Sequence, residues 1–451
     1  MISKTVKQVQ TRSSEAGSEA ARKRIVIVGG GFGGIAAARA LKHCDAEIIL
    51  IDRRNHHIFQ PLLYQVATAV LSPSEISAPI RQLSLLQENV NVILGEVTAV
   101  DKDLRSVTVL SPGTGESQIR FDYLIIASGT EPSYFGHNEF AEYAPGLKNL
   151  RDAEAIRTKI LTAYELAETT ADEIERSRQM TFVLVGGGPT GVELAASMAQ
   201  LARITLRRQF RRIDPATSAI ILIEGGGRIL PTFDERLAVA AATRLERLGV
   251  RILTGAKVEK VDESGVIADG KRIPSATVVW TAGVAPSPIL KQLGAKTDRG
   301  GRILAGPHMN VDEACEVFVV GDAAAVVTDN RPVPGVAPAA IQQGRHVGRL
   351  IARQLAGQGP PPPFRYHDRG NMAVVGRNFA LLETRHIRTS GFITWLIWAF
   401  VHILSLPQLQ NRVRVMTQWF WSYYTGQRSS RLIPEFPNRE VVLVPNVASP
   451  Q

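Results

Sequence analysis

RIVIVGGGFGGIAAARAL, residues 24–41, joins a run of β-branched side chains to a glycine cluster and an alanine-rich segment. This order predicts a β-strand, a tight turn and an α-helix. Gly29 would make the turn, Gly31 would let a pyrophosphate approach the backbone, and Gly34 would let the helix pack on the strand. The free N–H groups and the dipole of such a helix favour an anion at its N-terminus. The stretch therefore predicts a dinucleotide-binding unit.

The same pattern returns as FVLVGGGPTGVELAA at residues 182–196, where Gly186, Gly188 and Gly191 take the same three roles. A single glycine cluster is weak support, because glycines are common in turns, but two copies in the same strand-to-helix setting are far stronger. The pair predicts an α/β protein with two Rossmann-like dinucleotide-binding domains, one for a flavin and one for a nicotinamide. That combination is typical of an electron-transfer enzyme.

An acidic residue ends the second strand expected after each fingerprint. Asp52 follows the strand Glu47–Ile51, and Glu224 follows the strand Ala219–Ile223. A carboxylate there accepts hydrogen bonds from the adenosine ribose diol and repels a 2′-phosphate. Glu224 therefore predicts a preference for NADH over NADPH, which the nearby Arg228 would soften. Asp52 could instead cap the element that follows it.

The later part of the chain is expected to return to the first domain. Val317–Val320 is a buried strand that ends in Gly321-Asp322, and a helix follows at Ala339–Leu355. Further helices are expected over 150–178 and 192–206. The expected divisions are a disordered N-terminal tail (1–23), the first part of the FAD-binding domain (24–135), the NADH-binding domain (136–285), the second part of the FAD-binding domain (286–363), a separate C-terminal region (364–433) and a final tail (434–451).

Charge and cysteine content limit the classes of function. Lys and Arg number 52 against 42 Asp and Glu, and the net charge of +10 suits an anionic partner. Cys44 and Cys315 are the only cysteines, so a disulfide framework, a cysteine-rich metal site and a redox dithiol are not expected. The adjacent His56 and His57 have no cysteine or carboxylate cluster beside them, so no metal site is expected there either.

The C-terminal region 364–433 has membrane character. Between residues 388 and 433 there are five arginines, no acid and four of the five tryptophans. GFITWLIWAFVHILSL (391–406) is uncharged but, at 16 residues, shorter than the roughly 20 that a spanning helix needs. With Val413–Tyr424 it predicts a pair of helices that lie on an anionic membrane surface. The alternatives are a buried helix with a homodimer contact, or a tilted transmembrane helix; the aliphatic setting argues against nucleic acid.

Together these motifs resemble the glutathione-reductase-like flavoproteins with two dinucleotide-binding domains, and within them the type II NADH dehydrogenases, which are single-subunit NADH:quinone oxidoreductases. The resemblance covers about residues 24–433. It is carried by IDRRNHHIFQPLLYQVATAVLSPSEISAPIR (51–81), VGGGPTGVELA (185–195), VFVVGDAA (317–324), VAPAAIQQGRHVG (336–348) and GFITWLIWAFVHILSL (391–406).

The resemblance implies a set of residue roles. A non-covalently bound FAD would be held by Gly29, Gly31, Gly34, Asp52 and Asp322, with the helix N-terminus at Ala339 and Ala340 facing the flavin. NADH would be held by Gly186, Gly188, Gly191 and Glu224. Glu193 would be a catalytic residue near nicotinamide and flavin, or a helix acid stabilised only by the dipole. The residues packing near the flavin would be His56, His57, Gln60, Tyr64 and Gln65.

One departure concerns the quinone site, which in the family is usually AQxxxQ. Here the stretch is APAAIQ (337–342), so Pro338 replaces the first glutamine, and Gln342 alone remains as the catalytic amide able to reach a quinone carbonyl. Gln343 could compensate for the lost glutamine, but it is expected to point elsewhere on the helix.

The expected function is FAD-dependent transfer of electrons from NADH to a membrane quinone without proton pumping. The protein is expected to lie on the cytoplasmic face of a bacterial inner membrane. A reductase of a soluble acceptor such as ferredoxin or rubredoxin is the alternative within the same fold. A flavin- or NADH-sensing membrane protein without turnover is the alternative from another class.

Overall fold

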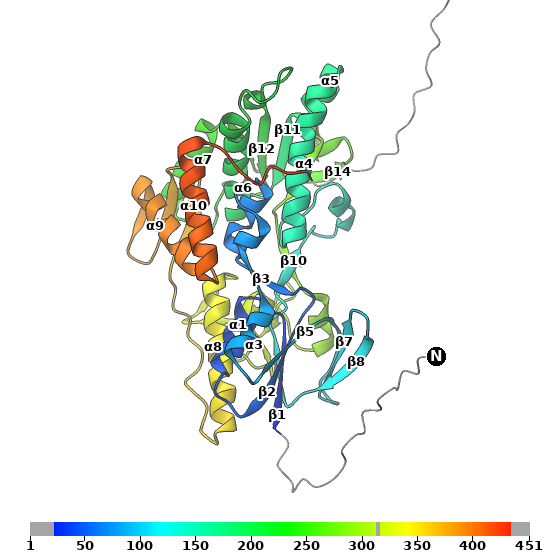
Figure 1. The fold of residues 1–451 in the computed structure, drawn as a ribbon, viewed down its shortest axis with the longest axis vertical. Helices are drawn as coiled ribbons and strands as arrows, with labels where there is room; N and C mark the ends of the chain where they lie inside the picture. The colour runs from blue at the N-terminus through cyan, green and yellow to red at the C-terminus, as the bar shows by residue number, and fades with distance from the viewer. Residues whose placement is uncertain (1–21, 313–315, 434–451) are drawn as a thin grey trace, which may run out of the picture.

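Two parallel sheets, each carrying one glycine fingerprint, organise the molecule, which a computed structural model describes at residues 22–312 and 316–433. The strand order is β20-β9-β1-β2-β5 in the first sheet and β13-β12-β11-β17 in the second. Figure 1 shows the two domains stacked along the long axis of the molecule. The prediction of two Rossmann-like domains is confirmed. Their strands are β1 (Lys23–Val28), β2 (Ala46–Asp52), β5 (Val90–Leu94), β9 (Tyr123–Ile126), β20 (Val317–Val319), β11 (Thr181–Val185), β12 (Ala219–Glu224), β13 (Val250–Thr254) and β17 (Thr277–Trp280).

The central strands of both sheets are buried after their first one or two residues. The side chains of Ile25–Ile27 and of Phe182–Leu184 are all 0% exposed. Burial on both faces explains why these strands are continuous apolar runs rather than alternating apolar and polar residues.

A late segment of the chain completes the first domain. β20 pairs in parallel with β9, and α8 (Ala337–Leu355) packs along α1 (Phe32–Ala40). The two helices cross closely, because a Cβ on Gly344 would lie 2.1 Å from the carbonyl oxygen of Gly33. A Cβ on Gly348 would likewise lie 2.8 Å from the Ala37 carbonyl oxygen. The glycines of α8 therefore serve helix packing.

The single helix predicted over 150–178 is wrong. The structure divides this segment into α4 (Leu150–Thr169) and α5 (Glu173–Gln179). The helix stops because Thr170 takes an extended backbone conformation, with φ −69° and ψ 140°. The side chain of Asp172 then caps the first turn of α5 and starts a new helix.

The helix after the second fingerprint differs at its ends from the prediction over 192–206. It begins earlier, as α6 (Pro189–Gln200), because Pro189 is well suited to a first helical turn. It then continues as a π-helical turn over Leu201–Thr205.

Smaller elements connect and flank the two domains. β10 (Thr130–Pro132) pairs in antiparallel fashion with β18 (Val284–Pro286), where the chain passes between the domains in each direction. The other elements are α2 (Leu63–Ala67), α3 (Leu83–Leu86), α7 (Glu235–Arg247), β3 (His56–Ile58), β4 (Ser77–Pro79), β6 (Glu96–Asp101), β7 (Ser106–Ser111), β8 (Gly115–Arg120), β14 (Val258–Asp262), β15 (Gly265–Ala268), β16 (Lys271–Pro274), β19 (Ile303–Leu304), β21 (Ala324–Ala325), β22 (Val327–Thr328), β23 (Arg331–Pro332), β24 (Asn371–Val374), β25 (Ala380–Glu383) and β26 (Arg388–Gly391). The predicted tails lie outside the described residues, except that β1 already begins at Lys23.

The C-terminal helices α9 (Phe392–Ser405) and α10 (Leu409–Thr425) lie beside the second domain (Figure 1). Their inner faces join its core, where Trp398 is 3% and Val415 is 0% exposed. Their outer faces are apolar yet open: the side chains include Ile393, Phe400 and Phe420, which are 67%, 64% and 64% exposed. Within the part of the chain that the structure describes, no helix has both the length and the hydropathy needed to cross a membrane.

Candidate active site

The turns of the two glycine fingerprints have the same geometry. Gly29 and Gly186 have φ values of +106° and +113°, which side-chain-bearing residues rarely adopt. The Gly29 amide donates to the carbonyl oxygen of Ile51 at 2.7 Å, and the Gly186 amide donates to that of Ile223 at 2.7 Å. Each turn is thus tied to the neighbouring strand of its own sheet.

The other fingerprint glycines divide into packing and open positions. A Cβ on Gly34 would lie 1.9 Å from the carbonyl oxygen of Gly29, so helix and strand meet there too closely for a side chain. Gly191 has the same 1.9 Å approach to Gly186. A Cβ placed on Gly31 or on Gly188 would meet no other part of the described protein within 4 Å. These open positions are where a pyrophosphate can reach the backbone.

The two predicted ribose acids occupy matching positions. Asp52 accepts from the Gly30 amide at 2.7 Å through Oδ2, and Glu224 accepts from the Gly187 amide at 2.6 Å through Oε2. Backbone bonds therefore fix both carboxylates beside the fingerprint while lone pairs remain for ribose hydroxyls. Asp52 also accepts from the Arg54 amide at 2.7 Å through Oδ1, so its carboxylate joins the fingerprint turn to the loop that follows β2.

Three helix N-termini offer anion sites. α1, α6 and α8 begin at N-cap residues Gly31, Gly188 and Val336, none of which supplies a side-chain cap. None has an acidic residue in its first turn. The first N–H groups of α1 and α6 can therefore reach a phosphate. In α8, Pro338 has no N–H, and the amides of Ala339 and Ala340 already donate to the Val336 carbonyl oxygen at 3.0 and 3.1 Å, so this end offers mainly the helix dipole.

The first domain also contains buried polar side-chain atoms that could form hydrogen bonds with a ligand. Among the described residues, Oγ of Ser128 is buried without a hydrogen-bond partner, and buried Nε of Arg54 has no hydrogen bond and only the Asp52 carboxylate 3.6 Å away. A bound dinucleotide would supply acceptors and donors beside both. Together with the open glycine and the uncapped helix, these orphaned atoms fit FAD in the first domain.

Asp322 lies at the start of a short turn that α8 holds in place. The Gly321 amide donates to Oε1 of Gln343 at 2.6 Å, and the Gln343 side chain is 2% exposed. Burial lowers the pKa of the nearby Lys148, and the charge of Asp322 works in the opposite direction. Asp322 thus faces a half-buried cation at the junction of the two domains. Gln343 points away from Gln342, as expected.

Gln342 is engaged with the backbone in this structure. Its Nε2 donates to the carbonyl oxygen of His367 at 3.0 Å, and its Oε1 accepts from the His367 amide at 2.9 Å. Pro338, the departure from the family motif, occupies the first turn of α8, where no N–H is needed for the helix. Ala339 and Ala340 follow it and are buried.

Glu193 lies on α6, two residues after the end of the second fingerprint. Its Oε1 accepts from the Val374 amide at 3.2 Å. Burial raises the pKa of Glu193 to about 8, and the bond from Val374 offsets only part of that rise. The carboxyl group is therefore largely protonated near neutral pH.

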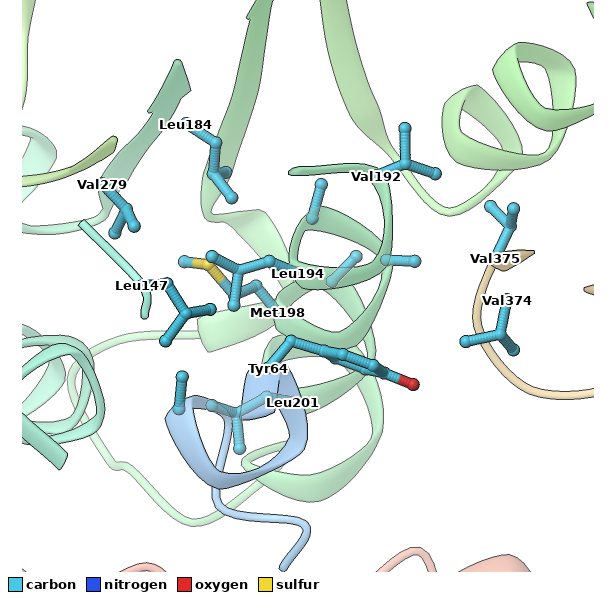
Figure 2. Packing of buried hydrophobic residues seen from close by; sticks show 14 of the residues in the cluster. Tyr64, Leu147, Leu184, Val192, Leu194, Met198, Leu201, Val279, Val374 and Val375 are labelled. Carbon is cyan, nitrogen blue, oxygen red and sulfur yellow. The ribbon is translucent and has the colours of Figure 1, made fainter. Parts of the chain in front are cut away.

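Glu193 faces a cavity that we call the tryptophan cavity. It has a volume of ≈ 120 Å³, and its lining includes Tyr64, Trp395, Trp398, Trp419 and Arg428. Figure 2 shows Tyr64 lying across α6 with its hydroxyl directed toward the segment that carries Val374. The cavity thus joins the nucleotide helix to the C-terminal helices.

A buried cation, Arg428, completes this cavity, and no carboxylate pairs with it in the part of the chain that the structure describes. The Arg428 guanidinium donates to the carbonyl oxygens of Thr68 at 2.7 Å and Ser197 at 3.0 Å. Burial lowers the pKa of Arg428 to about 9. In the sequence, Arg428 is recognisable only as one of the basic residues between 388 and 433. No local motif predicts its contact with the backbone of α6.

The side chains that follow β2 do not all pack in one place. His57 Nδ1 lies 3.1 Å from the Gly30 carbonyl oxygen, so His57 packs against the first fingerprint. Gln60 instead donates to the Lys148 carbonyl oxygen at 3.0 Å. Gln65 bonds the Tyr64 hydroxyl and accepts from Trp419 Nε1 at 2.7 Å, within the wall of the tryptophan cavity.

Two parallel-sheet domains with matching fingerprints define a flavin- and nicotinamide-dependent oxidoreductase. A family model described as pyridine nucleotide-disulphide oxidoreductase matches residues 23–344. The type II NADH:quinone oxidoreductase Ndh of Mycobacterium tuberculosis is 42% identical and covers 92% of this chain and 91% of its own length. NdhA of the same organism, with the same description, is 40% identical and covers 93% and 91%.

The chain therefore belongs to the type II NADH:quinone oxidoreductases. Among solved structures, NDH2 of Plasmodium falciparum in complex with NADH matches with a TM-score of 0.83 at 19% identity, covering 90% of this chain and 99% of that one. This likeness supports the fold. The predicted family, enzyme class and cofactors, FAD with NADH as substrate, are confirmed, and a soluble acceptor is not favoured.

Proposed function

We propose that this chain passes electrons from NADH to a membrane quinone without proton pumping, and that the quinone ring binds in the tryptophan cavity beside Glu193. The observation that carries the proposal is that Glu193, whose pKa burial raises to about 8, lines an aromatic cavity. Reduction of a quinone takes up two protons with two electrons, and aromatic side chains suit a flat ring.

The residues of the first domain would hold FAD. Gly31 would admit the diphosphate, Asp52 would bind the ribose, and Asp322 would meet the ribitol chain. The N-terminus of α8 at Ala339 and Ala340 would face the ring edge. When bound, FAD accepts a hydride from NADH and passes two electrons onward.

The residues of the second domain would hold NADH and manage one proton. The open backbone at Gly188 would admit the diphosphate of NADH, and Glu224 would bind its ribose. Because Oε1 of Glu193 accepts the Val374 amide, Oε2 is left to carry the proton toward the cavity. Glu193 would donate this proton to a quinone oxygen and then regain one from solvent.

The test separates the two half-reactions in the FAD-loaded enzyme. In stopped-flow experiments with Glu193→Gln, NADH should bleach the FAD absorbance within about threefold of the wild-type rate. The return of colour on adding quinone should slow about 100-fold, which is the usual scale for loss of an acid catalyst. If bleaching by NADH slows as much as the quinone step, Glu193 belongs to the NADH site instead.

Gln342→Ala provides the matched comparison, because Gln342 is the other candidate for a quinone contact. Its two bonds to His367 would have to open before its amide could reach a ring. We therefore expect a smaller loss in the quinone step than for Glu193→Gln. A larger loss would move the quinone ring to the N-terminus of α8.

We also propose that the enzyme sits on an anionic membrane surface, at the cytoplasmic face of a bacterial inner membrane. The exposed apolar faces of α9 and α10 support this proposal, and so do arginines such as Arg414, which is exposed on α10. A homodimer contact is the competing use of the same faces.

A further inference from the structure

A second and larger cavity lies beside the crossing of α1 and α8. Its volume is ≈ 420 Å³. α1 contributes Phe32 and Ala36 to its wall, α3 contributes Leu86, and α8 contributes Ile341. We call it the arginine cavity, because Arg39, Arg345 and Arg349 line it. A volume of this size falls within the range of about 300–1,000 Å³ typical of ligand sites.

Three arginines line this cavity. They are Arg39 at the end of α1, and Arg345 and Arg349 on α8, four and eight residues after Ile341 on the same helix face. No Asp or Glu lines it. Over residues 22–312 and 316–433, the structure gives none of the three guanidinium groups an ion pair.

The remaining titratable group of the lining is uncharged at neutral pH. Burial lowers the pKa of His57 to about 4, and the charge of Arg39 lowers it further in the same direction. The cavity thus combines apolar walls with positive charge from three arginines and no negative charge. Its chemistry is complementary to an anion that carries a hydrocarbon chain.

The position of the cavity narrows the source of such a ligand. Ser405, Pro407 and Gln408, from the turn between α9 and α10, form part of its wall. The neighbouring Leu404 and Leu409 are 50% and 74% exposed, and they belong to the outer apolar faces of those helices. The cavity is therefore continuous with the surface proposed to contact lipid.

We propose that the arginine cavity is a binding site for one anionic phospholipid, with an acyl chain along Phe32 and Ile341 and the phosphate among the three arginines. The proposal rests on the membrane attachment proposed above, but not on the path of the electrons. A bound lipid would join the first domain to the C-terminal helices. It would act as a specific structural ligand in addition to general attraction by a charged surface.

The test uses full-length, FAD-loaded protein in neutral detergent. Mixed micelles would contain phosphatidylglycerol and phosphatidylcholine with identical chains, and native mass spectrometry would count the lipids retained. We expect wild type to retain one phosphatidylglycerol with at least about tenfold preference. Replacing Arg39, Arg345 and Arg349 with Gln should abolish the preference. Ile341→Trp should lower retention by filling the cavity with all charges kept.

The matched control removes the same charge from Arg207, Arg236 and Arg251, which are exposed elsewhere. It should leave the preference unchanged, and equal loss in both triple variants would overturn the proposal.

Competition identifies the occupant: lysophosphatidylglycerol should displace the lipid, whereas inorganic phosphate should not. Displacement by phosphate alone, displacement by a neutral long-chain quinone, or loss of FAD from the Arg39, Arg345 and Arg349 variant would each overturn it as well.

A separate measurement keeps this proposal distinct from the proposed function. Co-sedimentation with anionic vesicles reports general membrane binding, and the Arg39, Arg345 and Arg349 variant should retain it. Wild type that binds vesicles but retains no phosphatidylglycerol would contradict the lipid site alone. Slow quinone reduction in a variant with normal lipid retention would concern the tryptophan cavity alone.

Discussion

Glu224 and Arg228 lie on the same turn, but their charges are not equally available to a bound nucleotide. The Arg228 guanidinium donates to the carbonyl oxygens of Phe233 at 3.0 Å and Pro231 at 3.1 Å. Glu224 keeps its carboxylate at the fingerprint through the Gly187 amide. Arg228 is therefore occupied by its own loop, and the expected softening of NADH selectivity by Arg228 loses its structural basis.

We predict that Glu224→Gln narrows the preference for NADH over NADPH. The substitution removes a repulsion of the 2′-phosphate worth roughly 1–3 kcal/mol in a partly desolvated site. Catalytic efficiencies with both nucleotides provide the measurement, and Arg228→Gln serves as the control with little expected change. Equal efficiencies of the wild type with NADH and NADPH would remove this role from Glu224.

Glu193 should make the stability of the enzyme depend on pH. Burial raises its pKa to about 8 in the folded protein, from the ordinary glutamate value of 4.5. Between these values the folded state keeps a proton that the unfolded state has lost. Unfolding therefore releases a proton, and the free energy of unfolding falls as pH rises, by up to about 1.4 kcal/mol per pH unit.

The corresponding measurement compares the unfolding midpoints of wild type and Glu193→Gln at pH 5, 6.5 and 8. The unfolding midpoint of the variant should rise relative to that of the wild type as pH increases. The reason is that the glutamine side chain has no proton whose release on unfolding would favour the unfolded state. Exposed Glu246→Gln is the control and should follow the wild type. A constant difference between wild type and Glu193→Gln at all three values would contradict the assignment.

Single residues could be predicted where their role is local to one strand and turn. Gly29, Asp52 and Glu224 are of this kind, because each partner lies in the same strand–turn–strand unit. Arg428 and Gln342 could not be, because their partners, Ser197 and His367, come from other parts of the chain. No periodicity or motif brings such residues together.

At the scale of elements, the crossing of α1 and α8 decides whether the first domain can close. Gly344 permits it, since a Cβ there would meet the backbone of Gly33 at 2.1 Å. The fold prediction contained both helices, but it did not contain their contact. Composition locates a helix, whereas the distance between two helices depends on which small residues face each other.

We predict that Gly344→Ala destabilises the enzyme and lowers its FAD content, because the helices must move apart near the first fingerprint. A shift of 1–3 kcal/mol is the usual scale for an overpacked contact. Unfolding midpoints and the ratio of FAD to protein would measure both effects. Gly359→Ala is the control, because nothing lies within 4 Å of a Cβ at Gly359; similar behaviour of the two variants would contradict the prediction.

At the scale of the whole molecule, α9 and α10 have two different faces. Trp398, Leu406 and Val415 belong to the core of the second domain, at 3%, 1% and 0% exposure. Deleting residues 389–451 would therefore open that core as well as remove the surface that we propose contacts the membrane. Substitutions on the outer face separate these two effects.

We predict that replacing Ile393, Phe400 and Phe420 with Gln releases the enzyme from anionic vesicles by more than about 100-fold. Each buried apolar side chain contributes about 1.5–3 kcal/mol. Wild type should resist elution by salt alone, because apolar burial is not screened. Vesicle co-sedimentation provides the measurement.

The control for this prediction replaces Val239, Leu304 and Val327 with Gln, which are 59%, 48% and 67% exposed on other surfaces. It should bind vesicles like the wild type. If the outer-face variant instead keeps vesicle binding and loses a dimer, these helices form a subunit contact. The membrane proposal would then fail.

The late strand β20 and helix α8 also set the order in which a growing chain can fold. The sheet of the second domain, from β11 to β17, is complete once Trp280 has been synthesised. The first domain begins earlier but cannot close until Val317–Val319 and Ala337–Leu355 emerge from the ribosome. During synthesis the sheet of the second domain is therefore complete while β9 is still an open edge of the first sheet. The core of the second domain closes last, because Trp398 and Val415 are synthesised after α8.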